Sequence, residues 1–275
     1  MASCWWYILN IENLTNWNRK FHSPHSLFGI IGSSNQSGAN IDDTSLKAYW
    51  KFNEASGDII NQSESAADLG SAADIQVTGA TYGATGKIDD ALSFDGVNDT
   101  AEAGTSVSQF NFMHEDKFTI AWWMKYGSTP GTTEAIFSTD EQGEGAGIFI
   151  NTGATAVISL SATNPTPANI VNVTTGTGYI PDNTNWYFYV GRIDTSLTTD
   201  AGIMRRNDAN EVKANRSNAP AAGNAHRALL LAARQLTSPQ RYGDFDIDET
   251  SVWNKIMSSG DETSLYNSGS GLEIY

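Results

Sequence analysis

Three aspartates, Asp244, Asp246 and Asp248, occupy every second position of the stretch YGDFDIDETSVW. In a β-strand this spacing places all three carboxylates on one face of the sheet. A retaining glycosidase needs two carboxyl groups about 5 to 5.5 Å apart, and an inverting one needs about 6.5 to 9.5 Å. Alternate residues of a strand lie roughly 6.5 Å apart, so the spacing permits a sugar-cleaving site. The same oxygens could instead hold calcium or face solvent.

Catalysis on this strand would need a second acid in a suitable position. Glu249 is the only glutamate there, and because it directly follows Asp248 we expect it to point to the opposite face unless a β-bulge intervenes. No other catalytic motif replaces it, since the chain has no G-x-S-x-G elbow, no His-x-x-x-His pair and no phosphate-binding glycine loop. We therefore expect no catalytic residues and a protein that is not an enzyme.

Short strands must position these groups. From Leu46 onward, segments rich in aromatic and β-branched residues alternate with clusters of Gly, Asn, Asp and Pro; they include LKAYWKFN, DALSFDG, FTIAWWMKYG, AGIFINTG, AVISLSAT and NWYFYVGRID. The pattern predicts an all-β fold, an antiparallel β-sandwich of the jelly-roll type. The clearest helix is MSSGDETSLYN, with Ser258 or Ser259 as its cap, and we expect it to cover one end of the sandwich. The stretch AHRALLLAARQL is compatible with a helix or a buried strand.

The composition limits the partners. The 275 residues carry a formal charge of −15 with only 16 Lys and Arg, which argues against nucleic acid because such a partner demands a cationic surface. No apolar run reaches the roughly 20 residues that cross a bilayer, and the opening residues lack a recognisable signal peptide. We expect no membrane insertion. Cys4 is the single cysteine, so an intramolecular disulfide is excluded.

The first 45 residues differ from the rest. An aromatic start, MASCWWYILN, precedes a stretch rich in Ser, Gly and Asn. The side chains of Trp5 and Trp6 need burial, so two interpretations are open: a surface extension, or an arm that docks on other subunits of an assembly. We assign residues 1–45 to this N-terminal extension or docking arm and residues 46–275 to one folded domain.

Several stretches together resemble a known family. LKAYWKFNEASGD is similar to an opening strand, TGKIDDALSFDGVND to a G-K block, FTIAWWMK to a central tryptophan strand and NWYFYVGRID to a later core strand. The closing signature is represented by IDETSVW and SSGDETSLYN. In this order and spacing they resemble the laminin-G-like (LamG-like) domains of the concanavalin A-like lectin and glucanase jelly rolls.

The resemblance implies two stacked antiparallel sheets with loops at one rim, and it implies no particular chemistry. Jelly-roll hydrolases of the laminarinase type carry an E-x-D-x-x-E strand, which this chain lacks. The chain departs from the family at Thr250, where an aliphatic residue is usual. It also departs in residues 195–227, an insertion that is longer and more basic than the usual hairpin. We expect individual specificity to lie in this insertion.

Oxygen-rich loops suit calcium, which takes about six to eight oxygen ligands. Asp95, Asn98 and Asp99 fall within five residues, where the resembling pentraxin-like folds carry a calcium pair. The loop ARQLTSPQRYG, which would supply the partner ligands, contains no acid. One interpretation is a single structural calcium ion on this loop or on Asp246 and Asp248; ordinary Asx turns are the other.

Sugar recognition on such sandwiches uses exposed aromatic rings as stacking platforms. Trp50, Trp122, Trp186 and Trp253 match core positions of the family. Trp123 alternates with Trp122 and must point to the opposite face, so it is the first candidate for an exposed platform, with burial as the alternative. The further ligand-binding candidates are Tyr187, Tyr189 and Tyr242.

We expect a non-catalytic glycan-binding or adhesion module of a surface or virion protein, located on an extracellular surface or a virion, with a glycan or polysaccharide as its partner. An alternative is a structural virion or surface-layer decoration subunit without a ligand, in which residues 1–45 contact other subunits. A glycoside hydrolase on the same fold is the least favoured alternative.

Overall fold

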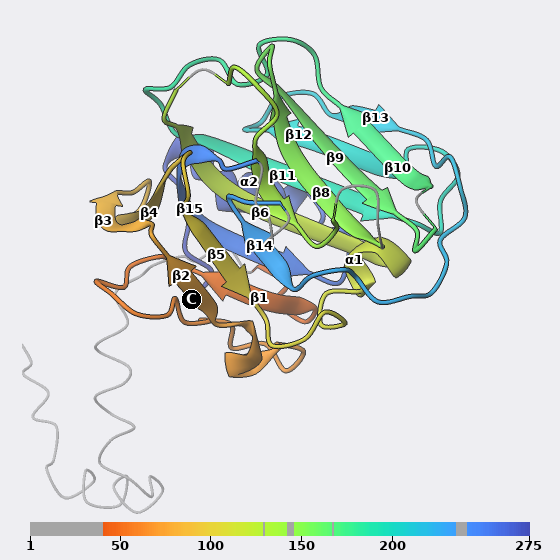
Figure 1. Cartoon of the computed structure of the whole chain (residues 1–275), viewed down its shortest axis with the longest axis horizontal. Coiled ribbons are helices and arrows are strands. Elements are labelled where there is room, and N and C mark those ends of the chain that lie inside the picture. The colour runs from red at the N-terminus through yellow and green to blue at the C-terminus, as the bar shows by residue number, and fades with distance from the viewer. Residues whose placement is uncertain (1–40, 129, 142–145, 167, 235–240) are drawn as a thin grey trace, which may run out of the picture. The chain divides into compact units, whose positions relative to one another are not determined.

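The computed structural model describes residues 41–275, except positions 129, 142–145, 167 and 235–240 (Figure 1). The docking arm predicted for residues 1–45 therefore lies almost entirely outside the described residues and stays a prediction. The strands are β1 (Leu46–Trp50), β2 (Ile75–Thr78), β3 (Thr81–Thr85), β4 (Asp90–Asp95), β5 (Thr100–Ala103), β6 (Lys117–Tyr126), β7 (Ala135–Ser138), β8 (Gly147–Gly153), β9 (Val157–Thr163), β10 (Asn169–Thr174), β11 (Tyr187–Asp194), β12 (Gly202–Arg206), β13 (Val212–Ala214), β14 (Leu229–Leu231) and β15 (Asp244–Trp253). The helices are α1 (Phe112–Glu115), α2 (Ser259–Tyr266) and the 3-10 turns η2 (Gly70–Ala73) and η3 (Asn267–Gly269).

The strands form two antiparallel sheets stacked face to face (Figure 1). Sheet A has the order β13-β12-β11-β6-β15-β4-β3, with β1 also paired to β15, and sheet B has the order β10-β9-β8-β7-β14-β5-β2. The predicted all-β antiparallel sandwich with a short C-terminal helix is confirmed. β15, the last strand, lies inside sheet A and pairs with β1, β4 and β6.

The main core lies between the two sheets. In β9, buried residues alternate with half-buried ones, and Ile158, Leu160 and Ala162 enter the core. Such alternation is what a strand with one covered face requires. Sheet A contributes Trp122 and Tyr189, whose rings stack with centroids 5.5 Å apart. Each large side chain buried in this way stabilises the fold by about 1.5 to 3 kcal/mol.

A second apolar layer covers the outer face of sheet A. Leu265 of α2 packs there with Trp123 and Phe188, and Tyr266 stacks on both aromatic rings. Because both faces of sheet A are covered, β6, β11 and β15 are buried along nearly their whole length. The expectation that the helix covers one end of the sandwich is therefore wrong: α2 lies on the outer face of a sheet.

Local sequence signals correspond to local structure. Ser258 is the N-cap of α2, and its Oγ accepts a hydrogen bond from the N–H of Asp261 at 3.1 Å. Within AHRALLLAARQL, Leu229–Leu231 form β14 between β5 and β7, so the strand alternative is correct for these residues. In the insertion of residues 195–227, β12 and β13 extend the edge of sheet A. None of the helices in the described residues has the length and apolar character to cross a bilayer.

Candidate functional site

A β-bulge in β15 brings Glu249 to the same face as Asp248. Asp248 pairs with Trp123 of β6 and Ser251 pairs with Ala121, so β15 has one extra residue between these pairs. Glu249 accommodates it with a left-handed φ of 46°, a conformation typical of bulges. The expectation that Glu249 points to the face opposite Asp248 is therefore wrong, because the β-bulge that was its stated exception is present. Two carboxyl groups adjacent in sequence both lie on the outer face of sheet A.

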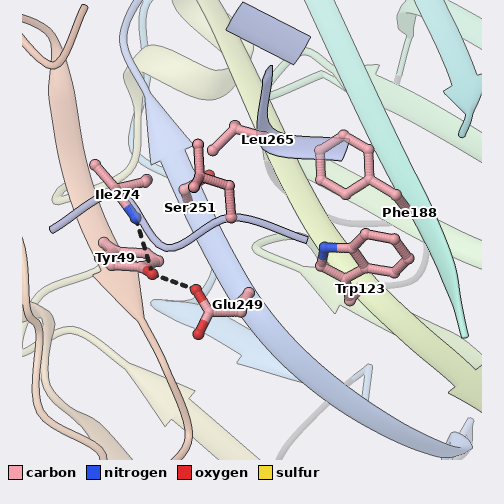
Figure 2. Close-up of a pocket in the computed structure, with 8 residues that line it drawn as sticks. Tyr49, Trp123, Phe188, Glu249, Ser251, Leu265 and Ile274 are labelled. Carbon is pink, nitrogen blue, oxygen red and sulfur yellow. Dashed lines mark hydrogen bonds between the residues drawn. The ribbon is translucent and has the colours of Figure 1, made fainter. Parts of the chain in front are cut away.

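The C-terminal residues close over Glu249 and leave a small cavity, the tail-covered pocket. Figure 2 shows Tyr49 donating a hydrogen bond to the carboxyl of Glu249 and accepting one from the N–H of Ile274 at 3.2 Å. The pocket holds about 10 Å³, close to the minimum that one water molecule needs. Its lining residues are Tyr49, Trp123, Phe188, Glu249, Ser251, Leu265, Leu272 and Ile274. While the tail is in place, the pocket can take nothing larger than water.

Burial dominates the electrostatics of the acidic pair. It raises the pKa of Glu249 to about 9, and the neighbouring carboxylates of Asp248 and Glu273 act in the same direction. Burial also raises the pKa of Asp248 to about 7, although the N–H groups of Lys87 and Ile88 each donate to its Oδ2 at 2.8 Å. Such groups could act as proton donors, but Asp248 is 0% and Glu249 5% exposed. A substrate therefore has no access to them.

The three alternating aspartates have separate roles. Asp244 accepts a hydrogen bond from Ser128 Oγ at 2.7 Å, and Asp246 forms an ion pair with Lys125 at 2.7 Å. Asp248 accepts the N–H groups of Lys87 and Ile88 and so holds the Gly-Lys loop, residues 86–88. The expectation that this row of carboxylates faces solvent is wrong for Asp248, which is buried.

Asp95, the last residue of β4, lies with Asn98 and Asp99 at the turn that leads to β5. Asp95 Oδ1 accepts from the N–H of Val97 at 2.8 Å, and Asp99 Oδ2 accepts from the N–H of Asp95 at 3.0 Å. The first contact is an Asx turn, and the second closes the same loop from its other end. Within residues 41–275, as far as they are described, no three His, Cys, Asp or Glu side chains form a group that could hold a metal. Of the two interpretations, these contacts favour turn chemistry for Asp95 and Asp99, and calcium at this turn or on the aspartates of β15 is the alternative that metal removal tests.

Two of the four aromatic candidates for sugar binding are buried. Trp123 is 2% exposed, because Tyr266 stacks on it at a centroid distance of 5.9 Å and Lys87 Nζ lies 4.9 Å from its ring centre. Tyr189 is fully buried. Neither offers a ring face to a sugar, so the predicted exposed platform is wrong for both. The continuous apolar run FTIAWWM was the available signal, since it is typical of a strand covered on both faces.

A larger cavity opens at one end of the sandwich. This rim cavity, of about 210 Å³, lies where the end of β6, the β8–β9 turn and the β10–β11 loop meet. Its lining residues are Tyr126, Ser128, Pro130, Ala156, Gly178, Ile180, Pro181, Asp182 and Asn183. Sequence reasoning did not find it, because three separate loops build it. The polar run PDNTN before a strand was the one local signal of an ordered loop.

Hydrogen bonds hold the β10–β11 loop in place. The N–H of Gly178 donates to the carbonyl of Thr155 at 3.0 Å, and the N–H of Ile180 donates to the carbonyl of Ala156 at 2.9 Å. Asn183 Nδ2 donates to the carbonyl of Gly127 at 3.3 Å. The loop is thereby tied to both neighbouring parts of the rim.

Asp182 orders the same loop from within. Its Oδ1 accepts from the N–H groups of Thr184 and Asn185, each at 2.9 Å, and its Oδ2 accepts from the hydroxyl of Tyr187 at 2.5 Å. These hydrogen bonds hold the pKa of Asp182 well below its usual range, and the one from Tyr187 has the largest effect. Tyr187, a predicted binding residue, is half-buried and lies next to the cavity through this contact. Tyr242, also half-buried, lies just before β15 and is not among the lining residues.

The wall of the rim cavity combines polar groups with apolar surface. The hydroxyl of Tyr126 donates to Glu134 Oε2 at 2.5 Å and lies 3.0 Å from Thr152 Oγ1. Burial raises the pKa of Glu134. Ile180 and the two prolines add apolar surface. A few fixed polar groups on an apolar wall are typical of small-ligand sites.

Comparison with known proteins agrees with the fold. A family model described as the concanavalin A-like lectin/glucanases superfamily matches residues 95–261, more than half of the chain. Among curated proteins, none matches the sequence significantly.

Similar solved structures include the binding domain of botulinum neurotoxin DC in complex with SialylT, at 12% identity and a TM-score of 0.60, covering 82% of this chain and 52% of that one. The same toxin domain in complex with rat synaptotagmin II is 12% identical, with a TM-score of 0.60, and the match covers 82% of this chain and 51% of that one. Trypanosoma rangeli sialidase in complex with 2,3-difluorosialic acid is 13% identical, with a TM-score of 0.60, and the match covers 86% of this chain and 35% of that one. At this identity the likeness concerns the fold. The chain spans about half the length of the toxin domains and about a third of the sialidase.

Proposed function

This chain belongs to the concanavalin A-like lectin/glucanase superfamily, and we propose that it is a non-catalytic glycan-binding module whose binding site is the rim cavity. The observation that carries the proposal is the cavity itself. It has a volume of about 210 Å³, and hydrogen bonds within and between its loops fix the lining groups before any ligand arrives. Such preorganisation reduces the entropy lost on binding.

The volume indicates how much of a glycan the cavity holds. Drug-sized ligands occupy pockets of about 300 Å³ or more, so the rim cavity fits one sugar ring and not an oligosaccharide. A hexose has about 12 non-hydrogen atoms, and at about −0.3 kcal/mol per atom this corresponds to a millimolar Kd. Useful avidity would then come from several copies binding one polysaccharide or surface.

The positions of the acidic residues support a non-catalytic role. Glu249 is buried beneath the C-terminal tail, and Asp248 is buried against the backbone of Lys87 and Ile88. Near the rim cavity, Glu134 accepts the hydrogen bond of Tyr126 and Asp244 accepts that of Ser128. These carboxyl groups orient the wall of the cavity, and that role needs no acid or nucleophile.

The solved neighbours support a sugar as the ligand class. The similar toxin domain is in complex with SialylT in one structure and with rat synaptotagmin II in another, and the similar sialidase is in complex with 2,3-difluorosialic acid. An extracellular surface or a virion, where glycans are met, is the location that we propose with this function.

Glycan arrays followed by titration of the best ligand test the proposal. Asn183→Ala removes an amide from the cavity wall, and we expect it to weaken binding about five- to tenfold. Asn172→Ala is the matched control, because Asn172 is an exposed asparagine on β10 that does not line the cavity. Equal loss in both variants would contradict the assignment of the site.

Two other outcomes would decide against the proposal. Release of reducing ends from a bound glycan would contradict the non-catalytic role. Absence of binding to every glycan would favour the alternative of a structural virion or surface-layer decoration subunit. Deletion of residues 2–40 then tests that alternative, since it requires the deletion to abolish assembly.

A further inference from the structure

Acidic side chains surround the rim cavity. Asp182 lines it directly, Glu134 is bonded to the hydroxyl of Tyr126, and Asp244 is bonded to the hydroxyl of Ser128. Three carboxyl groups are therefore in the wall or in direct contact with it. They belong to three segments that come together only in the folded domain: the β10–β11 loop, the residue before β7 and the first residue of β15.

Cations do not balance these charges inside the cavity. Of the described residues that line it, none is Lys, Arg or His. The nearby Lys125 forms an ion pair with Asp246. Arg206 lies over the rings of Tyr179 and Tyr187, at 5.2 and 5.5 Å from their centres, and donates to a backbone carbonyl. The whole chain adds to the same field, with a formal charge of −15.

We propose that the rim cavity selects sugar rings without an acidic group, and that it binds amino sugars better than neutral sugars and neutral sugars better than uronic or sialic acids. This inference rests on the proposed function, because it names the ligand class of the same cavity. It separates this chain from the similar structures that are in complex with SialylT and with 2,3-difluorosialic acid.

The expected size of the selection follows from Coulomb's law. Two unit charges about 7 Å apart in a partly solvated site interact strongly enough to change affinity about three- to tenfold. Such a contribution decreases as salt rises, because the screening length is about 8 Å at physiological ionic strength and about 3 Å at 1 M. The preference should therefore be large at low salt and nearly absent at high salt.

Matched sugars provide the test. Glucose, glucosamine and glucuronic acid, and the corresponding galacto series, are displayed at equal density on a multivalent carrier and titrated against the full chain at 20 mM and 1 M salt. We expect at least about a threefold preference for the amino over the acidic ring at low salt, and a smaller one at high salt. Equal or tighter binding of the acidic ring would overturn the inference and leave the proposed function standing. Absence of binding to every ring of both series overturns both.

Charge changes at position 183 localise the effect. Asn183 is exposed, and among the described residues its side chain makes one hydrogen bond, a long contact to a backbone carbonyl, so Asn183→Lys and Asn183→Asp should both fold. Asn183→Lys should move the ratio toward the acidic ring by about three- to tenfold, and Asn183→Asp should move it the other way. The same substitutions at Asn172 should leave the ratio unchanged. An unchanged ratio in both Asn183 variants, or an equal change at Asn172, would overturn the inference.

Discussion

Tyr49 and Glu249, 200 residues apart in the sequence, share a buried hydrogen bond that links β1 to the bulge in β15. The second oxygen of Glu249, Oε1, has no hydrogen-bond partner among the described residues. An ionised carboxylate in this position would be poorly compensated. The folded protein therefore favours the protonated form of Glu249, and stability should depend on pH.

Stability should decrease as the pH rises from acid to alkaline. Burial raises the folded-state pKa of Asp248 to about 7 and that of Glu249 to about 9, from ordinary values of 3.8 and 4.5. A raised carboxyl pKa stabilises the fold fully below the unfolded value, and this contribution disappears as pH passes the folded value. In urea unfolding measured from pH 4 to 10, the midpoint should fall, and the free energy of unfolding should fall by at least about 2 kcal/mol.

Glu249→Gln separates the two groups. The amide cannot ionise, so the decline between about pH 7 and 9, which comes from Glu249 alone, should disappear, whereas a shallower decline between about pH 4 and 7 that comes from Asp248 should remain. Glu64→Gln, at an exposed position, should leave the whole profile unchanged. A wild-type midpoint that is constant from pH 5 to 10 would show that neither carboxyl group is buried as described.

Loss of Glu262 should release α2 from sheet A. Its carboxylate, 1% exposed, binds Arg192 Nη1 at 2.9 Å and Arg205 Nη1 at 2.8 Å. Glu262→Ala leaves two guanidinium groups without this partner in a buried place, so we expect a loss of about 3 to 5 kcal/mol by urea unfolding. Asp208→Ala removes an exposed partner of Arg205 and should cost less than about 0.5 kcal/mol. Similar losses for both variants would contradict the importance of burial.

Gly86 lets the Gly-Lys loop close on Asp248. A Cβ atom at this position would lie 2.4 Å from the carbonyl oxygen of Asp90 and 2.8 Å from Asp248 Oδ2. Gly86→Ala should therefore lower the free energy of unfolding by about 1 to 3 kcal/mol. Gly131→Ala is the control, because a Cβ there meets no atom within 4 Å; its midpoint should not fall. A neutral Gly86→Ala would mean that the loop can move away from Asp248.

Metal removal should not change thermal stability. The carboxylates of Asp95 and Asp99 already accept backbone N–H groups, so we expect the same melting midpoint with EDTA and with added calcium. A ligand that binds only the folded state raises the free energy of unfolding by about 2.7 kcal/mol when present at 100 times its Kd, and so raises the melting midpoint. A rise of that order with calcium would identify a structural ion, and Asp99→Asn should then abolish it.

Sequence patterns predicted the features that depend on neighbouring residues. The alternation in β9 and the capping serine at position 258 are local, and both are present. The TGKIDDALSFDG block also has a physical reason, since its glycine and its backbone N–H groups receive Asp248.

Features that depend on distant contacts were not predicted. Trp123 is buried because α2, which begins at Ser259, lies on it. The orientation of Glu249 depends on a positive φ at a residue that is not glycine, and no neighbouring residue type signals such a conformation. The rim cavity needs three loops brought together by the sandwich, so no single stretch of sequence contains it.

The place of β15 has a consequence for biosynthesis. Its neighbours β1, β4 and β6 are all made before it. During synthesis on the ribosome, the edges of these strands that pair with β15 stay unpaired until the last strand emerges. Unpaired strand edges are prone to pair with other chains. Assembly of sheet A is therefore expected to be a late, largely post-translational event, and a nascent chain stalled before residue 244 should depend on chaperones to stay unaggregated.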